Sequence, residues 1–477
     1  MDKCTWTSAD IVKATGGRLV NGDFVASGVS IDTRTLTPAE LFVALKDARD
    51  GHDFVENAMA TGAAGALVSR EVGGGPQVVV EDVLVALERM AAFARDRSPA
   101  QRVAVTGSVG KTSVKDMLAQ IFSAVGAAHW PEKSFNNHYG VPLTLARMPE
   151  VRERAVFEIG MSTPGEIAPR SRLVSPHHAM ITKIAPAHLE GLGSIEAVAD
   201  EKADIFAGVQ DGGSIIVPAD DRFTDRLIQR GKSHVPSAEV LSFGTADGAT
   251  AKVTGYESDG TASKVHVALD GRPAAVSLNA VGDHWTGNVA AALLVAWRTG
   301  IAPHIAAEAL SGFAPPPGRG TAEILVLPDG SHALLIDDAY NANPESMRAA
   351  IAALSVRPGG RKLAALGEML EMGAGSEAGH AGLAPQLEAV DVDQAFLAGK
   401  AMAPLAAALS NRMDCHHAET AGPLEDTVKN ALRTGDTLLI KGSNASGMGM
   451  LVKALRQWSD ANRARVMNKE PRAPQGA

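Results

Sequence analysis

The chain has 477 residues, of which 45% are hydrophobic and 21% charged, a globular composition long enough for roughly three domains. A formal net charge of −9 and 4% aromatic residues argue against nucleic acid as a partner. The longest apolar stretch is too short to span a bilayer, the first six residues lack the apolar core of a signal peptide, and two cysteines make no disulfide framework. We therefore expect a cytoplasmic protein without membrane insertion.

Residues 1–98 predict a small α/β domain of short strands and helices joined by glycine-rich turns. A middle domain over 99–316 follows the polar, proline-containing end of this segment. It opens with a strand at 102–106 that runs into a turn and a helix. An acidic helix is expected over 196–206, and three further strands are expected at 155–158, 179–183 and 214–217.

Residues 251–278 alternate apolar and polar side chains around two Asp-Gly dipeptides, at 259–260 and 270–271. Asp-Gly between alternating segments is typical of tight hairpin turns, so this segment predicts a small antiparallel insertion. The Pro-Pro-Pro-Gly run at 315–318 marks the next domain boundary, since consecutive prolines neither continue a helix nor donate to a sheet.

A third domain is expected over 317–465, where strands alternate with alanine-rich helices. Such alternation predicts a parallel sheet with helices on both faces. One helix start is clear, because Asn343 is a good N-cap and Pro344 suits the first helical position. A polar tail without order is expected over 466–477. The strands of this domain are expected at 333–336, 362–366, 395–398 and 437–440.

The strongest local pattern is Thr-Gly-Ser-Val-Gly-Lys-Thr-Ser at 106–113, between an expected strand and an expected helix. Such a loop turns backbone N–H groups toward phosphate oxygens, the lysine reaches the outer phosphates, and the following hydroxyl binds Mg²⁺. Val105 stands where the usual pattern has its first glycine, so this is a shortened phosphate loop; the alternative is a plain turn with a surface lysine. The predicted phosphate-binding residues are Gly107, Ser108, Val109, Gly110, Lys111, Thr112 and Ser113.

Two further residues stand at or just past the ends of expected strands, where open α/β sheets gather their ligands. A carboxylate at Glu158 and an imidazole at His188 could hold a metal ion near Thr112. The residues alone also allow solvated or capping roles for both. Lys202, on the acidic helix, would by itself be interpreted as a solvent-facing lysine.

Several motifs change this interpretation when they are taken together. The phosphate loop, Glu-Ile-Gly at 158–160, Ala-His-Leu-Glu at 187–190 and the Lys202 helix resemble the Mur ligase family of ATP-dependent amide-forming enzymes. The resemblance covers about residues 5–457 and implies an α/β fold of three domains. These are a small N-terminal UDP-binding domain, a central ATP-binding domain whose mostly parallel P-loop-type sheet has helices on both faces, and a Rossmann-like C-terminal domain.

Further motifs resemble the family member that joins D-alanyl-D-alanine to UDP-N-acetylmuramoyl-tripeptide for peptidoglycan synthesis. They are Ser-Ile-Asp-Thr-Arg at 30–34, Asn-Asn-His-Tyr-Gly-Val-Pro at 136–142, Asp-Asp-Ala-Tyr-Asn-Ala-Asn-Pro at 337–344 and Leu-Gly-Glu-Met-Leu-Glu-Met-Gly at 366–373. The implied reaction converts the peptide carboxylate to an acyl phosphate, which the incoming amine attacks to give UDP-MurNAc-pentapeptide, ADP and phosphate.

The resemblance also implies roles for individual residues. Lys111, Lys202 and His188 would be catalytic, with ATP and two Mg²⁺ ions as cofactors. Thr112 and Glu158 would hold one Mg²⁺, and His188 with a carbamylated Lys202 the second. The nucleotide would meet Asn288, Arg319, Asp338 and Tyr340. The UDP-substrate and the D-Ala-D-Ala substrate would meet Ser30, Thr33, Arg34, Asn136, Asn137, Asn341 and Asn343.

Some positions depart from the family pattern, namely Ser162, Thr163, Glu368 and Asn444. None of these removes a phosphate or metal group, so the departures concern peptide-side contacts. Two alternatives stay open: a sister ligase that adds another amino acid or peptide, and a non-catalytic nucleotide-binding module. A monomer is expected, and the third residue of the acceptor peptide is either meso-diaminopimelate or lysine.

Overall fold

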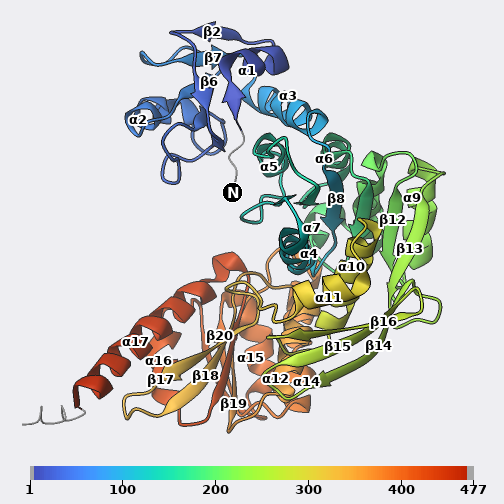
Figure 1. Cartoon of the computed structure of the whole chain (residues 1–477). Coiled ribbons are helices and arrows are strands. Elements are labelled where there is room, and N and C mark those ends of the chain that lie inside the picture. The colour runs from blue at the N-terminus through green and yellow to red at the C-terminus, as the bar shows by residue number, and fades with distance from the viewer. Residues whose placement is uncertain (1–4, 470–477) are drawn as a thin grey trace, which may run out of the picture. The chain divides into compact units, whose positions relative to one another are not determined.

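The computed structural model describes residues 5–469 and has the expected three-domain α/β architecture (Figure 1). The chain divides into two compact units. The first unit consists of Met1–Lys183, Ala199–Thr250 and Ala291–Ala309, and the second consists of Ile184–Val198, Ala251–Ala290 and Leu310–Ala477. The domain borders expected at residues 98 and 316 therefore stay predictions. Among the described residues, no helix has the length and apolarity needed to cross a membrane.

The N-terminal region of the first unit has a five-stranded sheet in the order β2-β7-β6-β5-β4. Only β2 runs antiparallel to its neighbour. Asp82 caps α3 by accepting from the N–H of Val85, and the buried side chains of α3 recur at helical spacing against the sheet. The elements are β1 (Trp6–Thr7), α1 (Ser8–Thr15), β2 (Arg18–Val20), β3 (Val25–Ala26), β4 (Val29–Ser30), β5 (Leu41–Val43), α2 (Val55–Ala60), β6 (Gly65–Val68), β7 (Gln77–Val79) and α3 (Val83–Asp96).

The central sheet of the first unit has six parallel strands in the order β13-β12-β11-β8-β10-β9. Its middle strands are buried along almost their whole length, as in sheets covered by helices on both faces. The strands are β8 (Gln101–Thr106), β9 (Ala128–His129), β10 (Arg154–Glu158), β11 (His178–Ile181), β12 (Ser214–Pro218) and β13 (Glu239–Gly244). The predicted strand 179–183 was too long, because Thr182 and Lys183 instead bond to the phosphate loop.

The helices around this sheet are α4 (Lys111–Val125), α5 (Gly140–Ala146), α6 (Ile167–Val174), α8 (Ile195–Ala203), α9 (Thr224–His234), α10 (Trp285–Arg298) and α11 (Pro303–Leu310). The first residues of α8 and α10 and the last of α11 belong to the second unit. The single helix predicted over 196–206 is wrong at its end, since α8 stops at Ala203 and a 3-10 segment follows over Asp204–Gly208.

The second unit contains the predicted antiparallel insertion, built from β14 (Ala251–Ser258), β15 (Ser263–Leu269) and β16 (Arg272–Leu278). Both predicted Asp-Gly turns are present, with Asp270 and Gly271 at φ of 48° and 74°. A short helix, α7 (Leu189–Leu192), also belongs to this unit.

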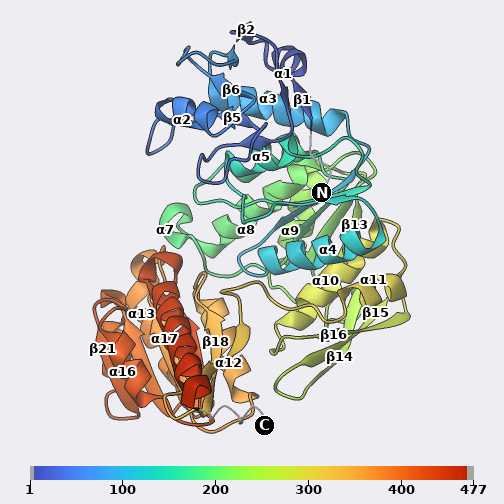
Figure 2. The same ribbon diagram turned by 60° about the vertical axis from the view of Figure 1, so that its left-hand side comes forward.

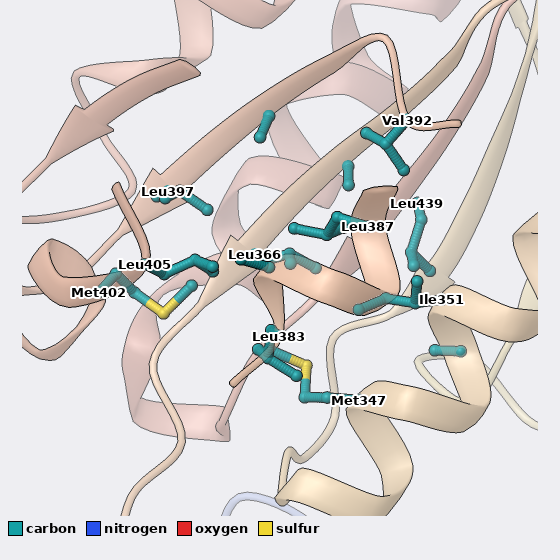
Figure 3. Close-up of a cluster of buried hydrophobic side chains, with 14 of the residues drawn as sticks. Met347, Ile351, Leu366, Leu383, Leu387, Val392, Leu397, Met402, Leu405 and Leu439 are labelled. Carbon is teal, nitrogen blue, oxygen red and sulfur yellow. The ribbon is translucent and has the colours of Figure 1, made fainter. Parts of the chain in front are cut away.

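The C-terminal sheet has six strands in the order β17-β18-β22-β19-β20-β21, all parallel except β17. Successive residues of β19 face opposite sides of the sheet. Leu366 packs with α12, α14 and α15 (Figure 3). Leu363 packs with α16 and α17, two helices that are labelled in Figure 2. Helices thus cover both faces, as predicted. The elements are β17 (Thr321–Val326), β18 (His332–Asp338), α12 (Pro344–Ser355), β19 (Lys362–Gly367), α13 (Ser376–Ala381), α14 (Ala384–Ala389), β20 (Gln394–Ala398), α15 (Ala403–Leu409), β21 (Asp414–Ala418), α16 (Leu424–Ala431), β22 (Thr437–Lys441) and α17 (Met448–Lys469).

The prediction at the start of α12 is confirmed, because Asn343 accepts from the N–H of Ser346 at 2.9 Å and forms a capping box with it. The predicted tail is wrong at its start. Residues 466–469 continue α17, while 470–477 lie outside the described residues.

Candidate functional site

The phosphate loop connects the end of β8 to the start of α4, which confirms the predicted strand–loop–helix order. Gly107 has a φ of 150°, and a Cβ there would lie 1.9 Å from Oγ1 of Thr182. Only glycine fits this position. The N–H of Ser108 donates to the carbonyl of Lys183 at 2.8 Å, and Oγ1 of Thr182 donates to the carbonyl of Val109 at 2.5 Å. The two residues that follow β11 thus fix the conformation of the phosphate loop.

The N-terminus of α4 has the features of an anion site. Gly110 precedes this 15-residue helix with a φ of 84° and has no side chain with which to cap it, so the N–H groups of the first turn are not capped from this position. Lys111 Nζ donates to the carbonyl of Gly107 at 2.6 Å, which holds the ammonium group over the loop. An anion bound there would meet both the helix dipole and this cation.

Glu158 ends β10, and the parallel register pairs it with Val105 of β8, so its side chain lies at the carboxyl edge of the sheet beside the phosphate loop. It is 1% exposed. Its Oε2 accepts from Thr112 Oγ1 at 2.8 Å, and its Oε1 accepts from Asn136 Nδ2 at 2.7 Å. The structure therefore brings together Lys111, Thr112, Glu158 and Asn136, although they lie far apart in the sequence.

This oxygen-rich group fits a magnesium ion. The two donors to the Glu158 carboxylate are neutral, a hydroxyl and an amide, and a buried carboxylate is costly without a cation to offset its charge. Carboxylate and hydroxyl oxygens are the ligands that Mg²⁺ prefers. Thr112 and Glu158 would supply these oxygens.

Lys202 lies on α8 and is 1% exposed, so the interpretation as a solvent-facing lysine is wrong. Burial lowers the pKa of Lys202 well below its ordinary value, and the nearby ammonium of Lys111 lowers it further, while Glu201 opposes the shift. This setting favours the neutral form of the amine over the ammonium. Only the neutral amine is a nucleophile, so this setting suits covalent modification.

The loop that follows Glu158 is held by two residues that the sequence analysis did not single out, Glu166 and Arg170. Glu166 accepts from the backbone N–H of Ser162 at 2.6 Å and pairs with Arg170 at 3.2 Å. Although burial opposes it, the hydrogen bonds from Ser162, Thr163 and Arg170 lower the pKa of Glu166. Ser162 and Thr163, which depart from the family pattern, are thus held by a carboxylate of their own loop.

Several predicted substrate residues lie in or beside turns of the first unit. Arg34 pairs with Asp32 at 2.6 Å on the surface, and this hydrogen bond lowers the pKa of Asp32 to about 2. Ser30 Oγ donates to the carbonyl of Asp32 at 3.2 Å, which tightens the turn that carries Thr33. Asn137 Oδ1 accepts from the N–H of Gly140 at 2.9 Å and so shapes the start of α5.

In the second unit, Asp338 lies at the end of β18 and accepts from Lys441 Nζ at 2.7 Å. Lys441 also donates to the carbonyl of Asn341 at 3.0 Å. The Arg319 guanidinium lies 4.1 Å from the ring centre of Tyr340, so Arg319 is more than a linker residue. Burial raises the pKa of Asp338, and the charges of Lys441 and Arg319 oppose this. The predicted residues Arg319, Asp338, Tyr340 and Asn341 thus form one cluster.

Lys441 was missed by the sequence interpretation, although it begins the Lys-Gly-Ser-Asn segment in which Asn444 departs from the family pattern. The sequence feature that could have identified Lys441 is its place at the end of a buried strand. Two other predicted residues of this unit lie on helices or at a helix start. The side chain of Asn343 caps α12, and Asn288 is half-buried on α10.

His188 also belongs to the second unit, where it precedes α7 with a φ of 56°. Its Nδ1 lies within ion-pair distance of a carboxylate oxygen of Glu371, which itself has a φ of 59°. Two non-glycine residues in the left-handed region therefore face each other. Such strained positions concentrate at functional sites.

Comparisons with known proteins agree with this geometry. Residues 105–296 match the Mur ligase middle domain, and residues 326–444 match the Mur ligase, glutamate ligase domain. The chain belongs to the Mur ligase family, whose members are ATP-dependent ligases.

Two of the relatives that are similar to this chain have the same name. The UDP-N-acetylmuramoyl-tripeptide–D-alanyl-D-alanine ligase of Escherichia coli (strain K12) is 35% identical over 463 residues, covering 94% of this chain and 98% of its own. The protein of that name from Bacillus subtilis (strain 168) is 34% identical with the same coverage. A crystal structure of MurF from Acinetobacter baumannii has a TM-score of 0.84 at 27% identity and covers 96% of this chain and 100% of its own.

Proposed function

We propose that this protein uses ATP to join D-alanyl-D-alanine to UDP-N-acetylmuramoyl-tripeptide in the cytoplasm, as a monomer, for peptidoglycan synthesis. The observation that carries the proposal is the buried Glu158 carboxylate, which binds Thr112 of the phosphate loop and Asn136 of the Asn-Asn-His-Tyr-Gly-Val-Pro segment. One side chain thus links the predicted nucleotide site to the predicted peptide site. The names of the relatives support this choice of substrates.

The proposed reaction has two steps. A carboxylate oxygen of the tripeptide attacks the γ-phosphorus of ATP, the bond to the ADP oxygen breaks, and an acyl phosphate forms. The amine of D-Ala-D-Ala then attacks the acyl carbon, inorganic phosphate leaves, and the amine loses a proton. The loop from Gly107 to Gly110, the N-terminus of α4 and Lys111 would orient the phosphates and balance their charge.

Mg²⁺, when bound, would neutralise phosphate charge and favour the in-line geometry of the transfer. Thr112 and Glu158 would hold one such ion, and His188 with Lys202 a second. A lysine serves as a ligand only after carbamylation. Its neutral Nζ forms a bond to the carbon of CO₂, one C=O π bond opens, and a proton is released to water, which leaves an anionic carbamate. The burial and lowered pKa of Lys202 support this assignment.

The cluster of the second unit would bind the nucleoside part of ATP. Asp338 would accept from ribose hydroxyls, and Lys441 holds its carboxylate in place. Tyr340, with Arg319 against its ring, would pack beside the nucleotide, together with Asn288. Ser30, Thr33 and Arg34 would bind the uridine diphosphate end of the acceptor, and the region near Asn343 would present D-Ala-D-Ala. The three proposed domains span residues 1–98, 99–316 and 317–465.

The test is phosphate release from ATP with Mg²⁺, UDP-MurNAc-tripeptide and D-Ala-D-Ala, omitting each substrate in turn. Release that needs both substrates, with a pentapeptide product identified by mass, is the expected result. Release with single amino acids would instead assign the chain to a sister ligase. Nucleotide binding without turnover would leave only a nucleotide-binding module.

A further inference from the structure

Glu201 is a buried carboxylate that precedes Lys202 on α8 and is only 7% exposed. Its Oε2 accepts from the backbone N–H of Gly165 at 2.7 Å, and its Oε1 accepts from the backbone N–H of Ile167 at 2.9 Å. Ile167 is the first residue of α6, and Gly165 lies in the loop that begins directly after Glu158. The Glu201 side chain of α8 therefore bonds to the segment that follows Glu158, a predicted metal ligand.

We infer that Glu201 is a positioning residue, which sets Lys202 relative to Glu158 by tying α8 to the loop between β10 and α6. This inference rests on the proposed function, in which Lys202 carries a carbamate. Successive residues of a helix point about 100° apart, so α8 presents Glu201 to the loop and Lys202 in a different direction. A movement of the loop would then shift α8, and Lys202 with it.

Local hydrogen bonds hold the loop in place, so it can fix the position of α8. Gly165 has a φ of 84°, Glu166 holds the N–H of Ser162, and Arg170 donates to the carbonyl of Gly160 at 2.5 Å. A carboxylate on two backbone N–H groups forms charge-assisted hydrogen bonds, which are stronger than neutral ones. Removing it would leave the buried N–H of Ile167 without this acceptor.

The other side of the same segment is held by ion pairs with α9, which provide a control. Asp200 pairs with Arg226 of α9 at 2.6 Å, and Asp204 pairs with Arg230 at 2.7 Å. The side chains of Arg226 and Asp200 are 47% and 33% exposed. Exposed ion pairs contribute little to stability. Replacing Arg226 therefore perturbs the same segment without touching its link to the loop.

The experiment compares wild type, Glu201→Ala, Glu201→Gln, Arg226→Gln and Lys202→Ala. Carbamate is measured by ¹³C NMR in ¹³C-bicarbonate with Mg²⁺ and ADP, and the Mg²⁺ concentration for half-maximal turnover is measured separately. Wild type should show a carbamate resonance that Lys202→Ala lacks. In Glu201→Ala this resonance should largely disappear, and the half-saturating Mg²⁺ concentration should rise about tenfold. Glu201→Gln keeps one acceptor oxygen and should be intermediate, and Arg226→Gln should match wild type.

Circular dichroism melting checks that each variant is folded, and Glu201→Gln carries the test if Glu201→Ala does not fold. Wild-type carbamate occupancy and Mg²⁺ dependence in the folded Glu201 variants would overturn the inference while the proposed function stands. Identical spectra for wild type and Lys202→Ala are a different result. They would show that Lys202 is not carbamylated, so that the proposed lysine chemistry fails and the positioning role fails with it.

Discussion

The two predicted nucleotide-binding regions are built in different ways. In the first unit, the Glu158 carboxylate is buried and bonded to the neutral side chains of Thr112 and Asn136. In the second unit, the Asp338 carboxylate is paired with the ammonium of Lys441, and a further cation, Arg319, lies nearby. The Asp338 carboxylate therefore has its counter-charge within the protein, whereas the Glu158 carboxylate is bonded to neutral donors.

This difference predicts how each region responds to ligands. A carboxylate with a resident cation is balanced in the free protein, so it suits a neutral group such as a ribose. A buried carboxylate on neutral donors is best balanced by an incoming metal ion. The first region should therefore depend strongly on Mg²⁺ and the second should not. The variants below test this contrast, in order of expected effect.

The largest effect is expected at Lys202. Lys202→Ala removes the group that would become a metal-binding carbamate, so kcat should fall by about 10³-fold, as when a group that stabilises transition-state charge is lost. Steady-state kinetics measure this, and a short carboxylate such as acetate should restore part of the rate. Unchanged turnover in Lys202→Ala would contradict the mechanism.

The second effect concerns the shape of the phosphate loop. In Gly107→Ala the new Cβ would lie 1.9 Å from Thr182 Oγ1, and the loop would have to move. Displaced backbone N–H groups should lower kcat/KM for ATP by about 100-fold. Gly449→Ala is the matched control, because a Cβ there meets nothing within 4 Å. Equal behaviour of the two alanine variants would show that the close approach at Gly107 does not matter.

The third variant tests the paired region. Lys441→Met leaves Asp338 without its ion-pair partner, which should destabilise the protein by about 3 kcal/mol and raise KM for ATP without changing the Mg²⁺ requirement. Because burial raises the pKa of Asp338, the stability deficit should be full above that pKa and shrink as the pH falls through it.

Urea unfolding of Lys441→Met across a pH series measures this deficit. Lys429→Met, which breaks an i,i+4 pair with Glu425 on α16, is the control and should change stability little. A deficit that grows on acidification would mean that the charge of Asp338 is stabilising in the absence of Lys441.

The smallest effect is expected at the exposed turn of the N-terminal region. The hydrogen bond from Arg34 lowers the pKa of Asp32 from 3.8 to about 2, so its stabilising contribution is present above pH 3.8 and is lost as the pH falls through about 2. Asp32→Asn should leave the melting temperature at pH 7 nearly unchanged, since the pair is exposed. A large loss at pH 7 would indicate a deeper structural role for this turn.

The features that were best predicted from the sequence are those that depend only on residues adjacent in the chain. The phosphate loop, the Asn343 cap and the two Asp-Gly turns follow from local conformational preferences, and all are present. The errors arose where tertiary contacts decide. The strand predicted through Lys183 stops at Ile181 because Thr182 and Lys183 bond to the phosphate loop.

Burial and long-range partners were the least predictable parts of the site. Nothing in the polar sequence around Lys202 indicates that its side chain is inaccessible, because that depends on how α8 packs. Likewise Lys441 meets Asp338 only because β22 lies beside β18 in the sheet, and Glu201 meets Gly165 only because α8 lies beside the loop after β10. Such contacts follow from topology, which local patterns do not encode.

The most direct test is a calorimetric titration of a non-hydrolysable ATP analogue into wild type and Glu158→Gln, with and without Mg²⁺. We predict that Mg²⁺ strengthens binding to wild type, and that Glu158→Gln loses this gain while its Mg²⁺-free affinity stays the same. A full Mg²⁺ effect in Glu158→Gln would contradict the central claim that this buried carboxylate receives the metal.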